Sequence, residues 1–316
     1  MHIRAVDLKD LDIFIDAAGS PDHRSEVERY LDRMFTAGSM RPEWCFIAED
    51  GDGPVGRVAF WTLPGIEEPF ALVLLDVDWE RDHAAVGTRL LRYTLDAARD
   101  LGARDIEHVI DTPPTRPQFQ HHQQERIELL QSAGFYLRRE TGRYERRGTE
   151  LPAGPRRLMF RTLEEVGKRT FIEAMERVSE DTLDHQIRAE REKLGTKRAA
   201  QEFFDDASRV RHVTSWWRLA YTPTGELAGL IMPAEPPGFL TIFYVGVVPD
   251  MRGRGYVNDL LAAGTSTLLQ ARKDDEPLIA DTDVSNAPMA AAFERAGWTR
   301  FAGRQEYVVD LAPDRG

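Results

Sequence analysis

Cysteine is nearly absent from this sequence, which has one, Cys45, among 316 residues. A lone cysteine cannot form a disulfide within its own chain. There is also no Cys-x-x-Cys pair, and the adjacent His121 and His122 point to different faces, with no carboxylate at ligand spacing. We therefore expect no metal site, and we expect a reducing cytoplasm as the compartment.

Long apolar runs and an excess of basic residues are missing as well. Residues 1–7 include the charged Arg4 and Asp7 and contain no apolar signal core, and no run approaches the roughly 20 apolar residues that cross a membrane. The 41 Lys and Arg residues are outnumbered by 53 Asp and Glu residues, which leaves a formal net charge of -12. That charge opposes non-specific binding to nucleic acid and to anionic membranes, and a cationic or neutral acceptor molecule fits it better.

The chain does contain enough apolar sequence to fold. With 42% hydrophobic and 30% charged residues, it has the composition of a globular protein rather than a disordered one. Its length suits one large domain or two domains of ordinary size. Internal repeats favour the second possibility.

The two halves of the sequence share landmarks in the same order. A glycine and a tyrosine ten residues apart end each half, Gly134 with Tyr144 and Gly297 with Tyr307. In both halves the pattern predicts a strand, a helical region, a hairpin, a long strand, a helix, a strand, a helix and a strand. We therefore predict two copies of one mixed α/β domain. The predicted boundaries are 1–148 for the first copy, 149–155 for a linker with proline and glycine, and 156–316 for the second copy.

The most informative segment follows a predicted buried strand at 239–248. That run is apolar, β-branched and aromatic, and it ends before Pro249. The sequence Arg-Gly-Arg-Gly at 252–255 then leads directly into a predicted helix that begins near Tyr256. Glycine lets the backbone turn tightly and approach a ligand, and free N–H groups at the start of a helix bind anions. The segment predicts a diphosphate site to which both arginines add charge, and the alternative is a solvent-exposed turn.

Wider spacing supports the diphosphate interpretation. Arg252, Gly255 and, less well, Val257 match the pattern R-x-x-G-x-G/A, and Asn286 followed by a later Gly-Trp pair matches a further part of the same signature. These residues resemble the signature of the GNAT superfamily of N-acetyltransferases. The resemblance covers about residues 159–309 and leaves the first copy outside it.

That resemblance implies a fold and a ligand. The fold is a mixed, mostly antiparallel sheet flanked by helices and splayed between two strands, where the pantetheine arm of acetyl-CoA enters. The residues implied in binding acetyl-CoA, as co-substrate, are Val247, Val248, Arg252, Gly253, Arg254, Gly255, Tyr256, Val257, Asn286 and Phe293.

The resemblance also implies direct acyl transfer to an amine, with no covalent enzyme intermediate. Backbone amides of Gly246 and Val247 would then polarise the thioester carbonyl. Two residues depart from the family pattern: Val257 replaces a small residue, and Phe293 replaces a tyrosine that protonates the leaving thiolate. We expect an N-acyltransferase, most simply an N-acetyltransferase, that acts on a small-molecule amine. The alternatives are a non-catalytic acyl-CoA-binding or regulatory protein and a transferase of a longer acyl group.

Candidates for the base that accepts the proton of the amine lie on the predicted strand at 278–283. Asp281 and Asp283 share one face of that strand because side chains alternate with a period of two. The alternative is a pair of solvent-exposed carboxylates at a strand end. Tyr244 and Tyr307 are weaker hydroxyl alternatives.

The first copy lacks the anion-binding turn. Asp82, His83 and Ala85 stand where the second copy has an arginine and two glycines, and an aspartate repels phosphate. We expect no productive coenzyme A binding there and a structural role for the copy. A tandem arrangement with one degenerate copy is similar to that of mycothiol synthase, in architecture only.

Overall fold

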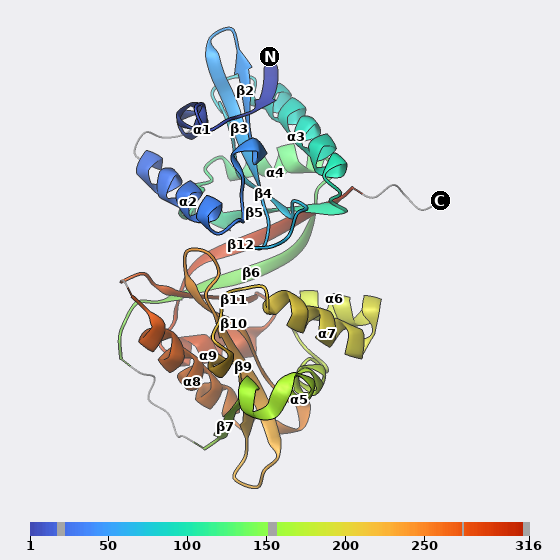
Figure 1. Cartoon of the computed structure of the whole chain (residues 1–316), viewed down its shortest axis with the longest axis vertical. Helices are drawn as coiled ribbons and strands as arrows, with labels where there is room; N and C mark the ends of the chain where they lie inside the picture. Colours follow the sequence, from blue (N-terminus) through green and yellow to red (C-terminus); the bar gives the residue numbers. More distant parts are fainter. Residues whose placement is uncertain (18–22, 151–156, 274, 312–316) are drawn as a thin grey trace. The chain divides into compact units, whose positions relative to one another are not determined.

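The computed structural model describes residues 1–17, 23–150, 157–273 and 275–311, which form two compact units (Figure 1). Unit 1 contains Met1–Glu140 and Ala302–Gly316, and unit 2 contains Thr141–Phe301. The units therefore do not follow the predicted boundaries at 148 and 156. Linker residues 151–155 lie outside the described residues. Within the described ranges, no helix is both long enough and apolar enough to cross a bilayer.

The order of helices and strands confirms the predicted repeat. The first half contains β1 (His2–Ala5), α1 (Leu11–Asp16), α2 (Arg24–Thr36), β2 (Cys45–Asp50), β3 (Gly53–Trp61), β4 (Ala71–Val77), α3 (His83–Asp100), β5 (Asp105–Thr112), α4 (Gln123–Ser132) and β6 (Tyr136–Arg146). The second half contains β7 (Met159–Thr162), α5 (Leu163–Val178), α6 (His185–Leu194), α7 (Thr196–Ala207), β8 (Arg218–Tyr221), β9 (Leu227–Ala234), β10 (Leu240–Val247), α8 (Tyr256–Ala271), β11 (Leu278–Asp283), α9 (Ala287–Arg295) and β12 (Thr299–Asp310).

Unit 1 is built on strands in the order β1-β2-β3-β4-β5-β12. Neighbouring strands are antiparallel except β4 and β5, which run parallel and pair only through Ala71 and Leu72 of β4. Alternate residues of β2 enter two hydrophobic clusters on opposite faces. Phe46 packs in the cluster that contains α3 and α4, while Ile47 packs in the cluster that contains α1 and α2.

Unit 2 repeats this plan with strands in the order β6-β11-β10-β9-β8-β7. Here β10 and β11 are the parallel pair, and they pair only through Leu240 and Thr241 of β10 before they separate. Helices α8 and α9 pack on one face of the sheet, and α5 and α7 pack on the other (Figure 1). The splayed, mostly antiparallel sheet implied by the family resemblance is confirmed.

Each half of the sequence ends with a strand that completes the sheet of the other unit. Residues 141–146 of β6 pair with β11 in unit 2, and residues 303–310 of β12 pair with β5 in unit 1. The tyrosines that mark the repeat lie in these strands, so Tyr144 is in the core of unit 2 and Tyr307 is in the core of unit 1. Tyr307 is buried among apolar side chains of unit 1. Its prediction as an alternative hydroxyl for the candidate site is therefore wrong.

Two neighbouring residues of β5 are buried in unit 1 with opposite electrostatic consequences. Burial raises the pKa of the Glu107 carboxyl from 4.5 to about 7, although the guanidinium of Arg138 lies 2.6 Å away and favours the ionised form. Burial lowers the pKa of His108 from 6.5 to about 4. The ring of His108 lies 3.0 Å from the carbonyl of Leu72 through Nδ1 and 3.2 Å from Nε2 of Gln120 through Nε2. Nδ1 therefore carries the proton of a neutral ring, and Nε2 accepts.

We expect Glu107→Gln and His108→Asn to show opposite pH dependences of unfolding. The unfolded chain releases the Glu107 proton from pH 4.5 upward while the folded chain keeps it to about 7, so the free energy of unfolding falls as pH rises through that window. The unfolded chain protonates His108 below 6.5 while the folded chain resists until about 4, so the free energy of unfolding falls as pH drops.

Urea unfolding of the two variants measures each slope, because each variant retains only the other residue's effect. In Glu107→Gln, where only His108 acts, the free energy of unfolding should fall by about 2–3 kcal/mol as the pH falls toward 4. In His108→Asn, where only Glu107 acts, it should fall by a similar amount as the pH rises toward 7. In the parent chain the two effects largely cancel between pH 4.5 and 6.5. Identical pH profiles for the two variants would contradict this assignment.

Candidate functional site

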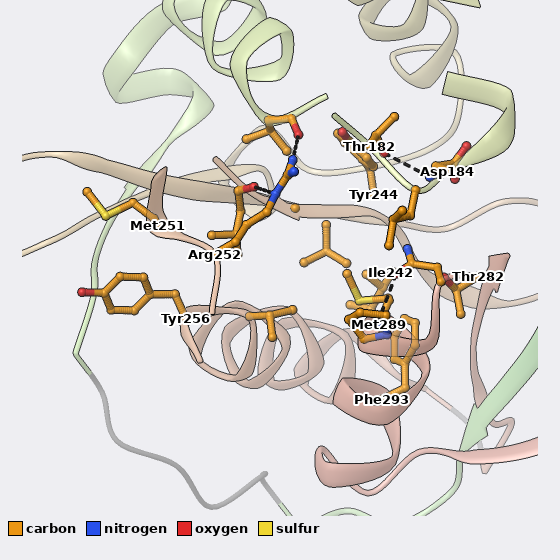
Figure 2. Close-up of a pocket in the computed structure, with 18 of the residues that line it drawn as sticks. Thr182, Asp184, Ile242, Tyr244, Met251, Arg252, Tyr256, Thr282, Met289 and Phe293 are labelled. Atoms are coloured by element: carbon orange, nitrogen blue, oxygen red, sulfur yellow. Dashed lines mark hydrogen bonds between the residues drawn. The ribbon is translucent and has the colours of Figure 1, made fainter. Parts of the chain in front are cut away.

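A cavity of about 450 Å³ opens in unit 2 where β10 and β11 separate (Figure 2). Its walls are the end of α5 with the loop that follows, β10, the turn before α8, β11 and the start of α9. All of the residues predicted to bind acetyl-CoA line this cavity except Val248 and Arg254. Segments far apart in sequence therefore meet at the splay.

The backbone of β10 presents amides to the cavity in alternation. The N–H of Val248 donates to the carbonyl of Ala228 at 3.0 Å, so it points toward β9. Because the direction of the amides alternates along an antiparallel strand, Gly246 also points toward β9, and Val245 and Val247 point toward the gap. Of the two predicted oxyanion donors, Val247 is placed for that role and Gly246 is not. The N–H of Val245, which was not among the predicted donors, shares the cavity-facing direction.

Gly246 has a packing role instead. A Cβ at this position would overlap the side chain of Val178 at the end of α5. The glycine thus lets α5 approach β10 closely, and this approach forms one wall of the cavity.

The predicted anion-binding turn has the expected backbone geometry. Gly253 and Gly255 have φ angles of 76° and 74°, in the left-handed region that favours glycine, and Gly255 directly precedes α8. No side chain among the described residues caps the amino end of α8. The first N–H groups of this helix therefore remain available to an anion.

Arg157 holds the turn from outside the cavity. Its guanidinium donates to the carbonyl oxygens of Arg254 and Gly255, each at 2.9 Å, and forms an ion pair with the buried carboxylate of Asp259 at 2.7 Å. Since a planar peptide places its N–H opposite its C=O, the amides of Gly255 and Tyr256 are directed away from Arg157. Arg157 was not among the predicted site residues, although a carboxylate on the apolar face of α8, that of Asp259, signals a cationic partner.

The two arginines of the turn differ. Arg254 is exposed, and its side chain forms no hydrogen bond or ion pair with the residues that the structure describes. The guanidinium of Arg252 instead donates to backbone carbonyl oxygens of Val178, Glu180, Asp181 and Val247. The predicted contact of the Arg252 side chain with phosphate is therefore not the arrangement of this structure.

The two candidate carboxylates both lie on β11 but have different surroundings. Asp281 lines the cavity, and its Oδ1 lies 3.4 Å from Nε of Arg143 on β6. Asp283 is 4% exposed and accepts a hydrogen bond from the N–H of His185 at 2.9 Å. It is not among the cavity-lining residues. The expectation that both carboxylates face the site is wrong, because the amino end of α6 engages Asp283.

Three other predicted residues line the cavity, and the surroundings of each limit the chemistry that it can perform. Asn286 uses its side-chain oxygen to cap α9, accepting from the N–H of Met289 at 3.3 Å. Phe293 is buried and stacks on Tyr144 with ring centroids 5.3 Å apart. Tyr244 is half-buried, and burial, assisted by the negative charge of Asp184, raises the pKa of its phenol. Tyr244 therefore stays protonated near neutral pH and can donate a hydrogen bond, but it does not act as a base.

The corresponding gap in unit 1 is filled by the chain itself. The N–H of Leu74 on β4 donates to Oε1 of Gln118 at 3.1 Å. Arg126, which is 1% exposed, donates to the carbonyl of Leu75 and pairs with Asp76 at 2.6 Å. At the start of α3, Asp82 caps the helix by accepting from the N–H of Ala85. These contacts engage backbone groups of β4 and the start of α3 within unit 1 itself, and the absence of coenzyme A binding by the first copy stays a prediction.

Comparison with known proteins identifies the fold through structure alone. No protein-family model and no curated protein matches the sequence. A GCN5-related N-acetyltransferase from Sphaerobacter thermophilus is similar over 99% of this chain and 96% of its own, with a TM-score of 0.61 and 17% identity. A tandem GNAT protein from the clavulanic acid biosynthesis pathway is similar over 99% of both chains, with a TM-score of 0.54 and 14% identity. A glucosamine N-acetyltransferase region of a fungal multi-domain β-N-acetylglucosaminidase is similar over 97% of this chain and 38% of its own, with a TM-score of 0.56 and 14% identity.

Proposed function

We propose that this chain, which has the fold of the tandem GCN5-related N-acetyltransferases, moves the acetyl group of acetyl-CoA directly to an amine of a small molecule. One observation carries the proposal: the uncapped amino end of α8 opens onto the cavity between the separated strands β10 and β11. A diphosphate on the turn at 252–257 leaves the extended gap for a pantetheine arm. The cavity then holds the thioester beside the amides of β10.

The residues around the gap suit direct transfer of the acyl group from the thioester to the amine. The amine nitrogen attacks the thioester carbonyl carbon, a C–N bond forms, and the carbonyl oxygen gains negative charge. The N–H of Val247 donates to that oxygen, and one preorganised donor of this kind contributes roughly 3 kcal/mol. The carboxylate of Asp281 accepts the proton of the attacking nitrogen. The C–S bond then breaks, and the sulfur leaves with the electron pair.

Direct transfer fits the side chains of this chain better than an acyl-enzyme. Burial raises the pKa of the Cys45 thiol to about 12, and Cys45 lies in the core of unit 1. It therefore supplies no thiolate nucleophile. Phe293 offers no proton to the leaving group, but a thiolate whose conjugate acid has a pKa near ~8.5 departs readily and takes its proton from water.

Calorimetric titration with acetyl-CoA, followed by a thiol-release assay over a library of small amines, tests this function. We expect saturable binding of acetyl-CoA and release of free coenzyme A that one class of amine accelerates. Propionyl-CoA and butyryl-CoA in the same assay measure the preference for acyl chain length. Binding without release for any amine would support the alternative of an acyl-CoA-binding or regulatory protein, and absence of binding would contradict the proposal.

A further inference from the structure

Arg252 lies in the turn assigned to the diphosphate, but its side chain is committed to the backbone of two other segments. Nε donates to the carbonyl of Val247 at 3.1 Å, and Nη1 donates to the carbonyl of Asp181 at 3.1 Å. Nη2 donates to Val178 at 3.2 Å and to Glu180 at 2.5 Å. Four of the five N–H groups of the guanidinium are thus in use. A bidentate contact with phosphate would require breaking some of them.

The carbonyl oxygens that Arg252 binds need a cationic partner. Val178 is the last residue of α5, and the final carbonyl groups of a helix have no acceptor role within the helix. A positive charge at this end also complements the helix dipole. Asp181 then turns the chain sharply with a φ of 48°, an unfavourable angle for a residue other than glycine. Arg252 binds the carbonyls on both sides of that peptide bend and so holds its shape.

The loop at 179–184 is held at its other end by β11. Asp184 caps α6 by accepting from the N–H of Ile187 at 2.9 Å, and the next N–H, of His185, donates to Asp283 at 2.9 Å. Between these two attachments, Asp181, Thr182 and Asp184 line the cavity. The loop therefore brings the carboxylate-bearing residues Asp181 and Asp184 to the cavity wall, and carboxylates suit a cationic amine.

We propose that Arg252 is a positioning residue that fixes the loop at 179–184 for the amine acceptor, while backbone amides and Arg254 bind the diphosphate. This inference rests on the proposed function for the identity of the two ligands. Loss of Arg252 then impairs acceptor recognition and leaves coenzyme A affinity nearly intact. Loss of Arg254 has the reverse effect, which makes the two arginines of one turn matched controls.

Three measurements on full-length Arg252→Met and Arg254→Met test the assignment. Calorimetry with coenzyme A should give a Kd within about threefold of the parent for Arg252→Met and a loss of about tenfold or more for Arg254→Met. Hydrogen exchange at amides 179–187 should accelerate by about tenfold in Arg252→Met alone. With the amine found in the thiol-release assay, Arg252→Met should raise the acceptor KM by about tenfold and leave the acetyl-CoA KM within about threefold.

Arg252→Lys separates positioning from charge. Lysine retains the positive charge that would attract a phosphate, but its compact ammonium cannot reach four carbonyl oxygens in a planar arrangement. Hydrogen exchange at amides 179–187 should therefore be faster in Arg252→Lys than in the parent, as in Arg252→Met. Weakened coenzyme A binding in Arg252→Met, combined with parental exchange in that loop, would overturn the inference. Failure of the parent chain to bind coenzyme A would instead contradict the proposed function, while the exchange measurement would still decide whether Arg252 holds the loop.

Discussion

Gly255→Val is expected to weaken acetyl-CoA binding by about 100-fold or more, equivalent to about 2.8 kcal/mol. A left-handed backbone costs a residue with a Cβ about 1–2 kcal/mol. A branched side chain at this position also shields the first amides of α8, and each charge-assisted hydrogen bond lost contributes about 1.5–3 kcal/mol. The added Cβ itself meets only ordinary contacts, at 3.6 Å from Arg157 and Asn258. The variant should therefore fold but bind acetyl-CoA weakly.

Gly225→Val is the matched control for Gly255→Val. Gly225 has a φ of 87° in the turn between β8 and β9, and a Cβ there meets nothing within 4 Å. Both variants carry the cost of a left-handed valine, so both should lower the midpoint of thermal unfolding. Calorimetry with acetyl-CoA should show parental affinity for Gly225→Val. Equal affinities for the two variants would place the diphosphate somewhere other than this turn.

Local sequence patterns predicted the elements that form the candidate site. The strand at 278–283 and the helix that begins at Tyr256 are where the sequence places them, because alternation, glycine spacing and a terminating proline act over a few residues. The repeat was also visible, since both halves keep the same order of elements. Anion-binding geometry at Gly253 and Gly255 followed from the same local rules.

Long-range choices between equivalent partners were not predictable from those patterns. The strands that carry Tyr144 and Tyr307 have the same character, so periodicity cannot decide which sheet each one joins. Similarly, an arginine beside a glycine turn suits a phosphate or a set of carbonyl oxygens, and only the nearby end of α5 decides for Arg252. The period of two placed Asp281 and Asp283 on one face, but the amino end of α6 engages one of them.

Those differences between the two carboxylates lead to unequal effects of isosteric substitutions. Asp281→Asn should reduce kcat for the amine identified by thiol release by about 10²–10⁴-fold, because an amide cannot accept the proton of the attacking nitrogen. Acetyl-CoA affinity should stay within about twofold, since Asp281 lies on β11, away from the anion-binding turn. Asp283→Asn should keep kcat within about threefold, because an amide oxygen still accepts the N–H of His185.

If Asp283→Asn proved to be the inactive variant and Asp281→Asn the active one, the proton acceptor would have to be reassigned to Asp283. Retention of full activity by both variants would exclude a carboxylate base on β11, and proton transfer would then pass to solvent.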